Sequence, residues 1–191
     1  MEPVLAAGLG NPGEAYRVTR HNAGFSVLDE LCRRYSCRMG PGRGEYLAGQ
    51  IFLQDISLVL LKPMTYMNGS GRAVAEAMEQ FAVAPDRILV IVDDIMLPLG
   101  RLRMRPKGSD GGHNGLGSVI EELHTEEFAR LRLGIQSAEP PAADRLASYV
   151  LSPFLREETP LVSAMTARAA DMVIEFVVAG VDAAMTKCNS T

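Results

Sequence analysis

The chain has 191 residues, of which 47% are hydrophobic, enough to bury the core of one globular domain over residues 1–191. Its formal net charge of −4 argues against wholesale non-specific binding to nucleic acid. Without a long apolar run, we expect no membrane span, signal peptide or transit sequence. Three cysteines without a C-x-x-C pair favour a reducing compartment, and three scattered histidines meet no zinc-ligand spacing.

The chain opens with an apolar strand, residues 3–7, then a polar loop, then a helix over 25–35. Glycines in residues 8–13 match G-x-G-x-x-G, the pattern that rests a dinucleotide pyrophosphate on a helix N-terminus. A proline interrupts the pattern and the helix follows too late, so the glycines are better explained by a backbone course that presents Asn11 and His21 to one cleft. The plain alternative is a turn followed by a helix entry.

A strand pair follows, residues 45–52 and 56–61, and leads into a loop that carries Tyr66 and Asn68. Asn68 is placed to cap a helix that runs through Phe81, because Asn is among the preferred N-cap residues. Its amide could equally serve a ligand.

An unbroken apolar run, residues 87–92, is typical of a central strand that is covered on both faces, and it ends at Asp93 and Asp94. Open α/β sheets place their ligands at the carboxyl ends of such strands, so these acids are candidate site residues. The alternative is that they only cap the strand end in solvent.

Residues 101–110 are basic in an otherwise acidic chain. Strict alternation over 101–105 puts Arg101, Arg103 and Arg105 on one face of a predicted strand. A local basic face can dock a phosphate backbone, whereas its alternative is an ordinary solvated strand face.

A polar, glycine-rich loop over 107–115 enters a helix over 116–123, where free N–H groups suit an anion or a carbonyl oxygen. A last strand over 128–135 carries Arg130 and Arg132, which exposure on an edge strand would also explain.

The C-terminal part begins with a hinge-like connection at 138–143. A helix then runs from about Glu157 to Ala179 and ends at Gly180. A short helical turn finishes the chain.

Five motifs stand in order along this chain, each at the end of a strand or the start of a helix. They are GLGNPG (8–13) with Tyr16 and TRHNAG (19–24); KPMTYMNGSG (62–71); DD (93–94) with LPLG (97–100); GS (108–109) with GGHNGL (111–116); and RLRLGI (130–135). Tyr149-Val150-Leu151 with Phe154 extends the series. Together they resemble the bacterial-type peptidyl-tRNA hydrolase family.

The resemblance implies an α/β fold, a single-domain mixed twisted β-sheet flanked by helices, in a protein that is usually a monomer. It implies hydrolysis of the ester that joins a peptide to the 3′-terminal ribose of tRNA, hence a cytoplasmic enzyme whose partner is peptidyl-tRNA. We expect no cofactor and no metal, since an activated ester needs only a base and a place for the developing oxyanion.

The resemblance also assigns roles by motif. His21 is the expected catalytic base, Asp93 the group that orients and polarises it, and Asn11 an amide beside them that holds substrate and water. Further residues are expected to contact the substrate: Tyr16, Tyr66, Asn68 and Asn114. Arginines are expected to meet tRNA phosphates: Arg103, Arg105 and Arg132.

The chain departs from the family pattern at Gln136, where another glycine commonly follows Gly-Ile, and at His124, which replaces a frequent glycine before Thr125. Both lie away from the expected chemistry, so they bear on loop shape more than on activity. Two other functions stay open: a catalytically inactive RNA-binding scaffold of the same fold, and a dinucleotide-dependent enzyme.

Overall fold

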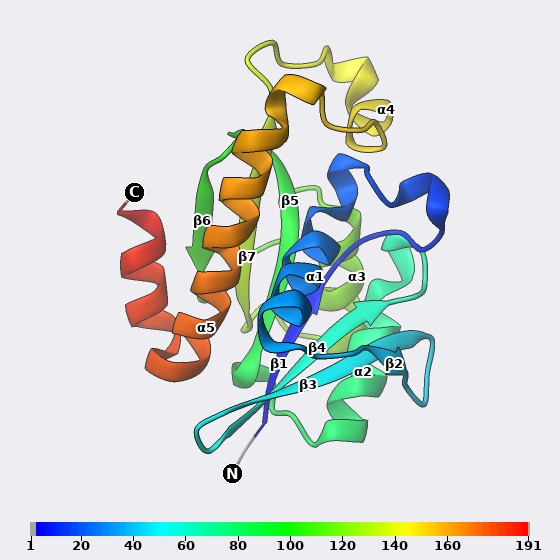
Figure 1. The fold of residues 1–191 in the computed structure, drawn as a ribbon. Helices are drawn as coiled ribbons and strands as arrows, with labels where there is room; N and C mark the ends of the chain where they lie inside the picture. Colours follow the sequence, from blue (N-terminus) through cyan, green and yellow to red (C-terminus); the bar gives the residue numbers. More distant parts are fainter. Residues whose placement is uncertain (1–2, 191) are drawn as a thin grey trace.

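The protein is described from a computed structural model that covers residues 3–190, and it folds as one mixed sheet between two layers of helices (Figure 1). The strands are β1 (Val4–Gly8), β2 (Gly40–Pro41), β3 (Tyr46–Leu53), β4 (Ile56–Pro63), β5 (Ile88–Pro98), β6 (Leu102–Arg105) and β7 (Ala129–Gln136). The α-helices are α1 (Ala23–Tyr35), α2 (Ser70–Phe81), α3 (Asn114–Leu123), α4 (Leu146–Val150) and α5 (Thr159–Asn189). The prediction of a single-domain mixed sheet flanked by helices is confirmed.

The seven strands lie in the order β2-β3-β4-β1-β5-β7-β6. The central strands β4, β1, β5 and β7 run parallel to one another, while β2, β3 and β6 pair antiparallel with their neighbours. Parallel strands are buried on both faces, and β1 and the first half of β5 are accordingly buried throughout.

Alternation along the strands divides the core into two halves. In β1, Ala6 packs with α1 and α5 on one face, whereas Leu5 and Ala7 pack with α2 and α3 on the other. Figure 1 shows α1 and α5 together in front of the sheet. Within residues 3–190, no helix is both long and apolar enough to cross a membrane.

The end of β5 and the position of β7 within the sheet differ from the prediction. β5 does not end at Asp93 and Asp94 but continues to Pro98, through a break in its register with β7 after Asp94. β7 is an inner strand and β6 is the edge, so Arg130 is buried, with 1% of its surface exposed, rather than lying on an exposed edge.

Helix starts also differ from the sequence prediction. Asn68 does not cap α2: it lies exposed inside a 3-10 turn, Met67–Gly69, and Gly69 is the N-cap residue. α3 begins at Asn114, two residues early, and His124 follows it with a φ of 53°, a left-handed conformation that explains why glycine is frequent there.

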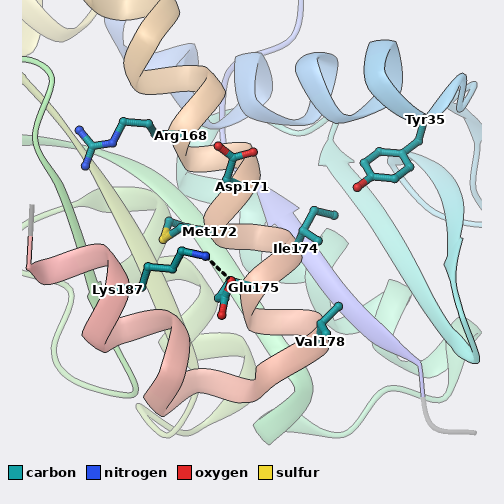
Figure 2. Close-up of a pocket in the computed structure, with 8 residues that line it drawn as sticks. All are labelled: Tyr35, Arg168, Asp171, Met172, Ile174, Glu175, Val178 and Lys187. Atoms are coloured by element: carbon teal, nitrogen blue, oxygen red, sulfur yellow. Dashed lines mark hydrogen bonds and ion pairs between the residues drawn. The ribbon is translucent and has the colours of Figure 1, made fainter.

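The C-terminal helix continues beyond its predicted end. Gly180 breaks α5 with a φ of 83°, as expected of a helix-ending glycine, but a second helical segment then runs back as far as Asn189. Lys187 Nζ and Glu175, 2.7 Å apart, join the two segments, as Figure 2 shows. The short helix α4 also lies where only a connection was expected.

Helix α1 sits unusually close to the sheet at Gly24. A Cβ at this residue would lie 2.5 Å from the carbonyl oxygen of Ile91 and 2.6 Å from the amide nitrogen of Leu9. The absence of a side chain therefore fixes where α1 starts, and with it the turn that carries His21.

We predict that Gly24→Ala lowers the free energy of unfolding by about 1–3 kcal/mol, because the methyl group must push backbone atoms of β1 and β5 apart. Urea unfolding measures the change. Gly40→Ala is the matched control, since its Cβ would meet no atom within 4 Å and its stability should stay the same or rise slightly. Equal stability of the two variants would contradict the close approach.

Candidate active site

His21 and Asp93 meet at the carboxyl edge of the parallel strands. His21 lies in a 3-10 turn, Arg20–Asn22, just before α1, and Asp93 lies in β5. His21 Nδ1 and Asp93 Oδ1 are 2.8 Å apart. The motifs predicted this meeting across some seventy positions of chain, and the structure brings the two groups within one hydrogen bond.

His113 is a third member of this cluster, and the prediction that the histidines are scattered is wrong for it. Its Nε2 lies 3.1 Å from the same Asp93 oxygen, and its Nδ1 accepts a hydrogen bond from the Leu116 N–H at 3.2 Å. A ring nitrogen that accepts carries no proton, so Nε2 is the protonated nitrogen and donates to Asp93. His113 is the N-cap residue of α3, a position that the predicted helix start at residue 116 did not give it.

The same geometry assigns the proton on His21. An ionised Asp93 carboxylate can only accept hydrogen bonds, so the proton between the two groups belongs to His21 Nδ1, which donates it. The Nε2 of His21 makes no hydrogen bond within residues 3–190, and His21 lines a pocket. The imidazole is thus oriented through Nδ1, and among the described residues its Nε2 is left without a hydrogen bond beside the pocket.

Asp93 is ionised although its side chain is only 3% exposed. Burial by itself raises the pKa of this carboxyl, but the interactions with His113 and His21, whose ring N–H groups both donate to Oδ1, outweigh burial and hold the pKa well below its usual range. The carboxylate is therefore present at every pH where an imidazole can act as a base.

The three side chains also raise the question of a metal, because their donor atoms lie within 4.8 Å of one another. The hydrogen bonding does not fit an ion. His113 Nδ1 already accepts the Leu116 N–H, so a metal on Nε2 would require a doubly deprotonated ring or the loss of the helix cap. The cluster is organised as a hydrogen-bond network around Asp93.

Asn11 is fixed from both sides. Its Oδ1 accepts the Met67 N–H at 2.8 Å, and its backbone exchanges two hydrogen bonds with the Asn22 side chain. Its Nδ2 donates to nothing within residues 3–190. Because Asn22 follows His21 directly, these bonds tie the loop of the base to the end of β1 and leave one N–H₂ group available.

The expected substrate-binding residues divide between two sides of the site. Asn114, exposed at the start of α3, lines the same pocket as His21. Tyr66 and Asn68 are exposed on either side of Met67, which holds Asn11, and Tyr16 meets Tyr66 edge to face with ring centroids 6.2 Å apart.

The pocket beside His21 has a volume of about 380 Å³. Its floor carries the polar cluster, and its walls carry apolar side chains that the sequence prediction missed: Ile95, Met96, Leu146 and Val150. The first two belong to the part of β5 that continues beyond its predicted end, and the last two to α4. A mixed lining of this kind suits a substrate with both a polar ester and variable apolar groups.

A second hollow, between α1 and α5, has about 550 Å³ and is drawn in Figure 2. Its lining combines Tyr35, Met172 and Val178 with paired charges, but no imidazole or side-chain amide. Volume alone therefore does not locate the chemistry.

The predicted basic face lies on the edge strand. Pairing of β6 with β7 sets Arg103 opposite Arg132 and Arg105 opposite Arg130, and these arginines with Lys107 line a shallow hollow. Like charges placed directly opposite each other repel, so the arrangement favours an anion between them.

The arginines of this hollow have different partners. The guanidinium of Arg130 donates hydrogen bonds to backbone carbonyl oxygens, among them Phe128 O at 3.2 Å and Ser109 O at 3.1 Å. Burial, with the nearby charge of Arg132, lowers the pKa of Arg130 to about 10. Arg132 reaches Asp94 at 3.3 Å, whereas Arg103 and Arg105 are exposed. The exposed pair is best placed to meet a phosphate.

Known proteins are similar to this chain over almost its whole length. The family described as Peptidyl-tRNA hydrolase matches residues 5–191. A peptidyl-tRNA hydrolase of Chlorobium chlorochromatii (strain CaD3) is 45% identical over 187 residues, 98% of either chain. One from Hydrogenobaculum sp. (strain Y04AAS1) is 40% identical over 183 residues, 96% of this chain and 95% of its own.

Solved structures agree. The crystal structure of peptidyl-tRNA hydrolase from Acinetobacter baumannii superposes with a TM-score of 0.91 at 33% identity, covering 98% of this chain and 95% of that one. Sequence, motif order and fold lead to one assignment: the chain belongs to the peptidyl-tRNA hydrolase family.

Proposed function

We propose that this chain hydrolyses the ester bond of peptidyl-tRNA, releasing free tRNA and peptide, by direct attack of water with His21 as general base. The observation that carries the proposal is the His21 imidazole, held through Nδ1 by the buried Asp93 carboxylate and open to a pocket through Nε2. Such an oriented base can act near neutral pH, where the intrinsic pKa of about 6.5 leaves imidazole largely unprotonated.

The steps follow from this arrangement. Nε2 of His21 takes a proton from water as the water oxygen attacks the ester carbonyl carbon, which gives a tetrahedral oxyanion. Asp93 stabilises the imidazolium and keeps the ring orientation. The ribose oxygen then leaves with the proton from His21, so the peptide carboxylate and the tRNA hydroxyl are the products.

Amides supply the remaining contacts in this proposal. The N–H₂ group of Asn11 is rigidly held and donates to the carbonyl or to the attacking water. Asn68 and Asn114 bind the peptide backbone, which suits a substrate of any peptide sequence. Tyr16 and Tyr66, packed edge to face beside Asn68, offer aromatic surface for a base at the end of the tRNA.

Binding of tRNA is assigned to the exposed arginines of the edge strand. Arg103 and Arg105, with Arg132 between them and Asp94, would contact phosphates and so give affinity without sequence preference. All the proposed residues come from one chain, which supports a monomeric enzyme, and a tRNA substrate supports a cytoplasmic location.

The alternative of an inactive RNA-binding scaffold explains the basic face alone. It gives no reason for a buried carboxylate that orients two imidazoles in the lining of a pocket. Release of free tRNA from an N-blocked aminoacyl-tRNA distinguishes the two.

We predict that His21→Ala lowers kcat in this assay roughly 10²–10⁴-fold, because general-base assistance is lost. Rapid quench of the parent enzyme should reveal no covalent peptidyl intermediate. Retention of most activity by the variant, or a trapped acyl-enzyme, would overturn direct water attack.

Asp93→Asn should lower kcat as well, because the amide cannot stabilise the imidazolium. It should also change acid stability. The folded pKa of Asp93 lies below its unfolded value of about 3.9, so its stabilisation is present above that pH and is lost as pH falls toward the folded pKa.

Urea unfolding at pH 5 and pH 3 measures the second effect. The parent should lose more unfolding free energy than Asp93→Asn between these two pH values. Equal losses in both proteins would show that the carboxyl pKa is not depressed in the folded state.

We predict that Arg103→Ala or Arg105→Ala weakens tRNA binding and flattens its dependence on salt, since each removes a phosphate contact. Hydrolysis of a minimal ester substrate should hardly change. Arg101→Ala is the matched control, an exposed arginine just before the same strand that does not line the hollow. Equal losses on both substrates would instead indicate damage to the catalytic site.

A further inference from the structure

A buried ion pair lies directly beside the proposed base and has no part in the mechanism above. Arg20, the residue before His21, has a side chain only 2% exposed, and its Nη2 lies 2.6 Å from Glu158 Oε2. Its Nη1 donates to the carbonyl oxygen of Ile135 at 3.2 Å. Tyr149 and Phe154 face the guanidinium, at 4.5 and 4.8 Å from their ring centroids.

Glu158 extends this contact into a network. Its Oε2 also accepts the Leu155 N–H at 2.7 Å, and its Oε1 accepts the Ser137 hydroxyl at 2.5 Å. The Tyr149 hydroxyl donates to Ile135 O at 2.7 Å and accepts the Ser137 N–H at 2.9 Å. The Glu158 carboxylate thereby joins the start of α5 to Ser137, just after β7. Ser137 in turn connects it to Tyr149 of helix α4.

The network contacts both the loop that carries His21 and helix α4, and both of these line the catalytic pocket. The backbone N–H of Arg20 donates to Ser152 O at 3.0 Å, and Thr19 forms an isolated bridge with Pro153, so the loop of His21 is bonded to the segment after α4. The same α4 that carries Tyr149 also carries Leu146 and Val150 into the pocket wall.

This arrangement suits orientation better than stability. Two charges taken out of water lose hydration that their attraction only partly returns, and apolar side chains of similar volume often stabilise a core equally well. Charged groups add directional contacts. A planar guanidinium that donates to a carboxylate and a carbonyl oxygen while it packs against two aromatic rings is held in one position.

We propose that Arg20 is a positioning residue for His21. Together with Glu158, it holds the loop of the base and the α4 wall of the pocket in one fixed relation, so that the imidazole meets the ester of a bound substrate at the reacting distance. The inference rests on the proposed role of His21 as base. Displacement of a catalytic group by about 1 Å can cost roughly 10²-fold in rate, which sets the scale of the effect.

The test removes both charges at once. In the Arg20→Met, Glu158→Gln double variant no charge is left buried alone, and the glutamine carbonyl can still accept the Leu155 N–H. We expect a thermal midpoint near that of the parent and a kcat that is lower by roughly ten- to a hundredfold on N-blocked aminoacyl-tRNA. The matched control is Arg72→Met, Glu45→Gln, which removes an Arg–Glu pair whose two side chains are both exposed and should leave kcat unchanged.

A second measurement separates positioning from general loss of structure. In a His21→Ala background, the same double change should lower kcat less than twofold, since it acts through a base that is no longer present. A parent-like kcat in the double variant, or an undiminished further loss in the His21→Ala background, would overturn the inference. If His21→Ala itself kept most activity, the proposed function would fail first, and the two failures are thus distinguishable.

Tyr149→Phe decides the matter if the double variant does not fold. It keeps the ring over Arg20 but removes the hydroxyl that joins Ile135 and Ser137. We expect a several-fold lower kcat with little change in thermal midpoint, and a parent-like kcat would count against the proposal.

Discussion

The structure of the site depends on one buried negative charge. Asp93 lies in the central part of the sheet, where an ionised carboxylate is costly unless donors surround it. Two imidazoles provide those donors from loops that are far apart in sequence, the one before α1 and the one before α3. Satisfying the carboxylate therefore requires both loops to close over the same strand, and the geometry of a base follows from that requirement.

The same physical device recurs around the site. Glu158 accepts hydrogen bonds from the segment just before α5 and from the connection after β7. Arg130 donates hydrogen bonds to backbone carbonyls of the loop before α3. Each is a charged side chain buried where an irregular segment meets the sheet. Regular elements are held by apolar packing, but loops have little apolar surface, so directional bonds to a buried charge are an effective means of fixing them.

How far the sequence predicts this structure depends on how local the signal is. The apolar run before Asp93 and the periodicity of α1 identify their elements, because burial on one or two faces imposes a pattern on a short window. The meeting of His21 with Asp93 was reachable only through motifs. The partnership with His113 was not predicted, because it depends on the exact residue at which α3 begins.

Features that depend on contacts between distant parts of the chain were not predicted, for a related reason. The burial of Arg130 depends on β6 returning to cover β7, which places the later strand inside the sheet, and no local pattern encodes that order. Helix α4 is short and half-exposed, so it has too few buried positions to show a period. The contribution of α4 to the walls of the pocket, including Val150, was missed for this reason, although His21, Asp93 and Asn114 were predicted.

The sheet also relates the basic face to the base. Arg103 pairs in register with Arg132, and Arg132 with Val92, the residue before Asp93. Three adjacent strands thus set the separation between a phosphate held at the edge and the carboxylate at the centre, and strand spacing is nearly invariant at about 4.8 Å. A substrate whose backbone has a fixed geometry but whose sequence varies can be selected by such a separation. In the proposed function, a chain with a net charge of −4 therefore binds tRNA through a few arginines rather than through overall attraction.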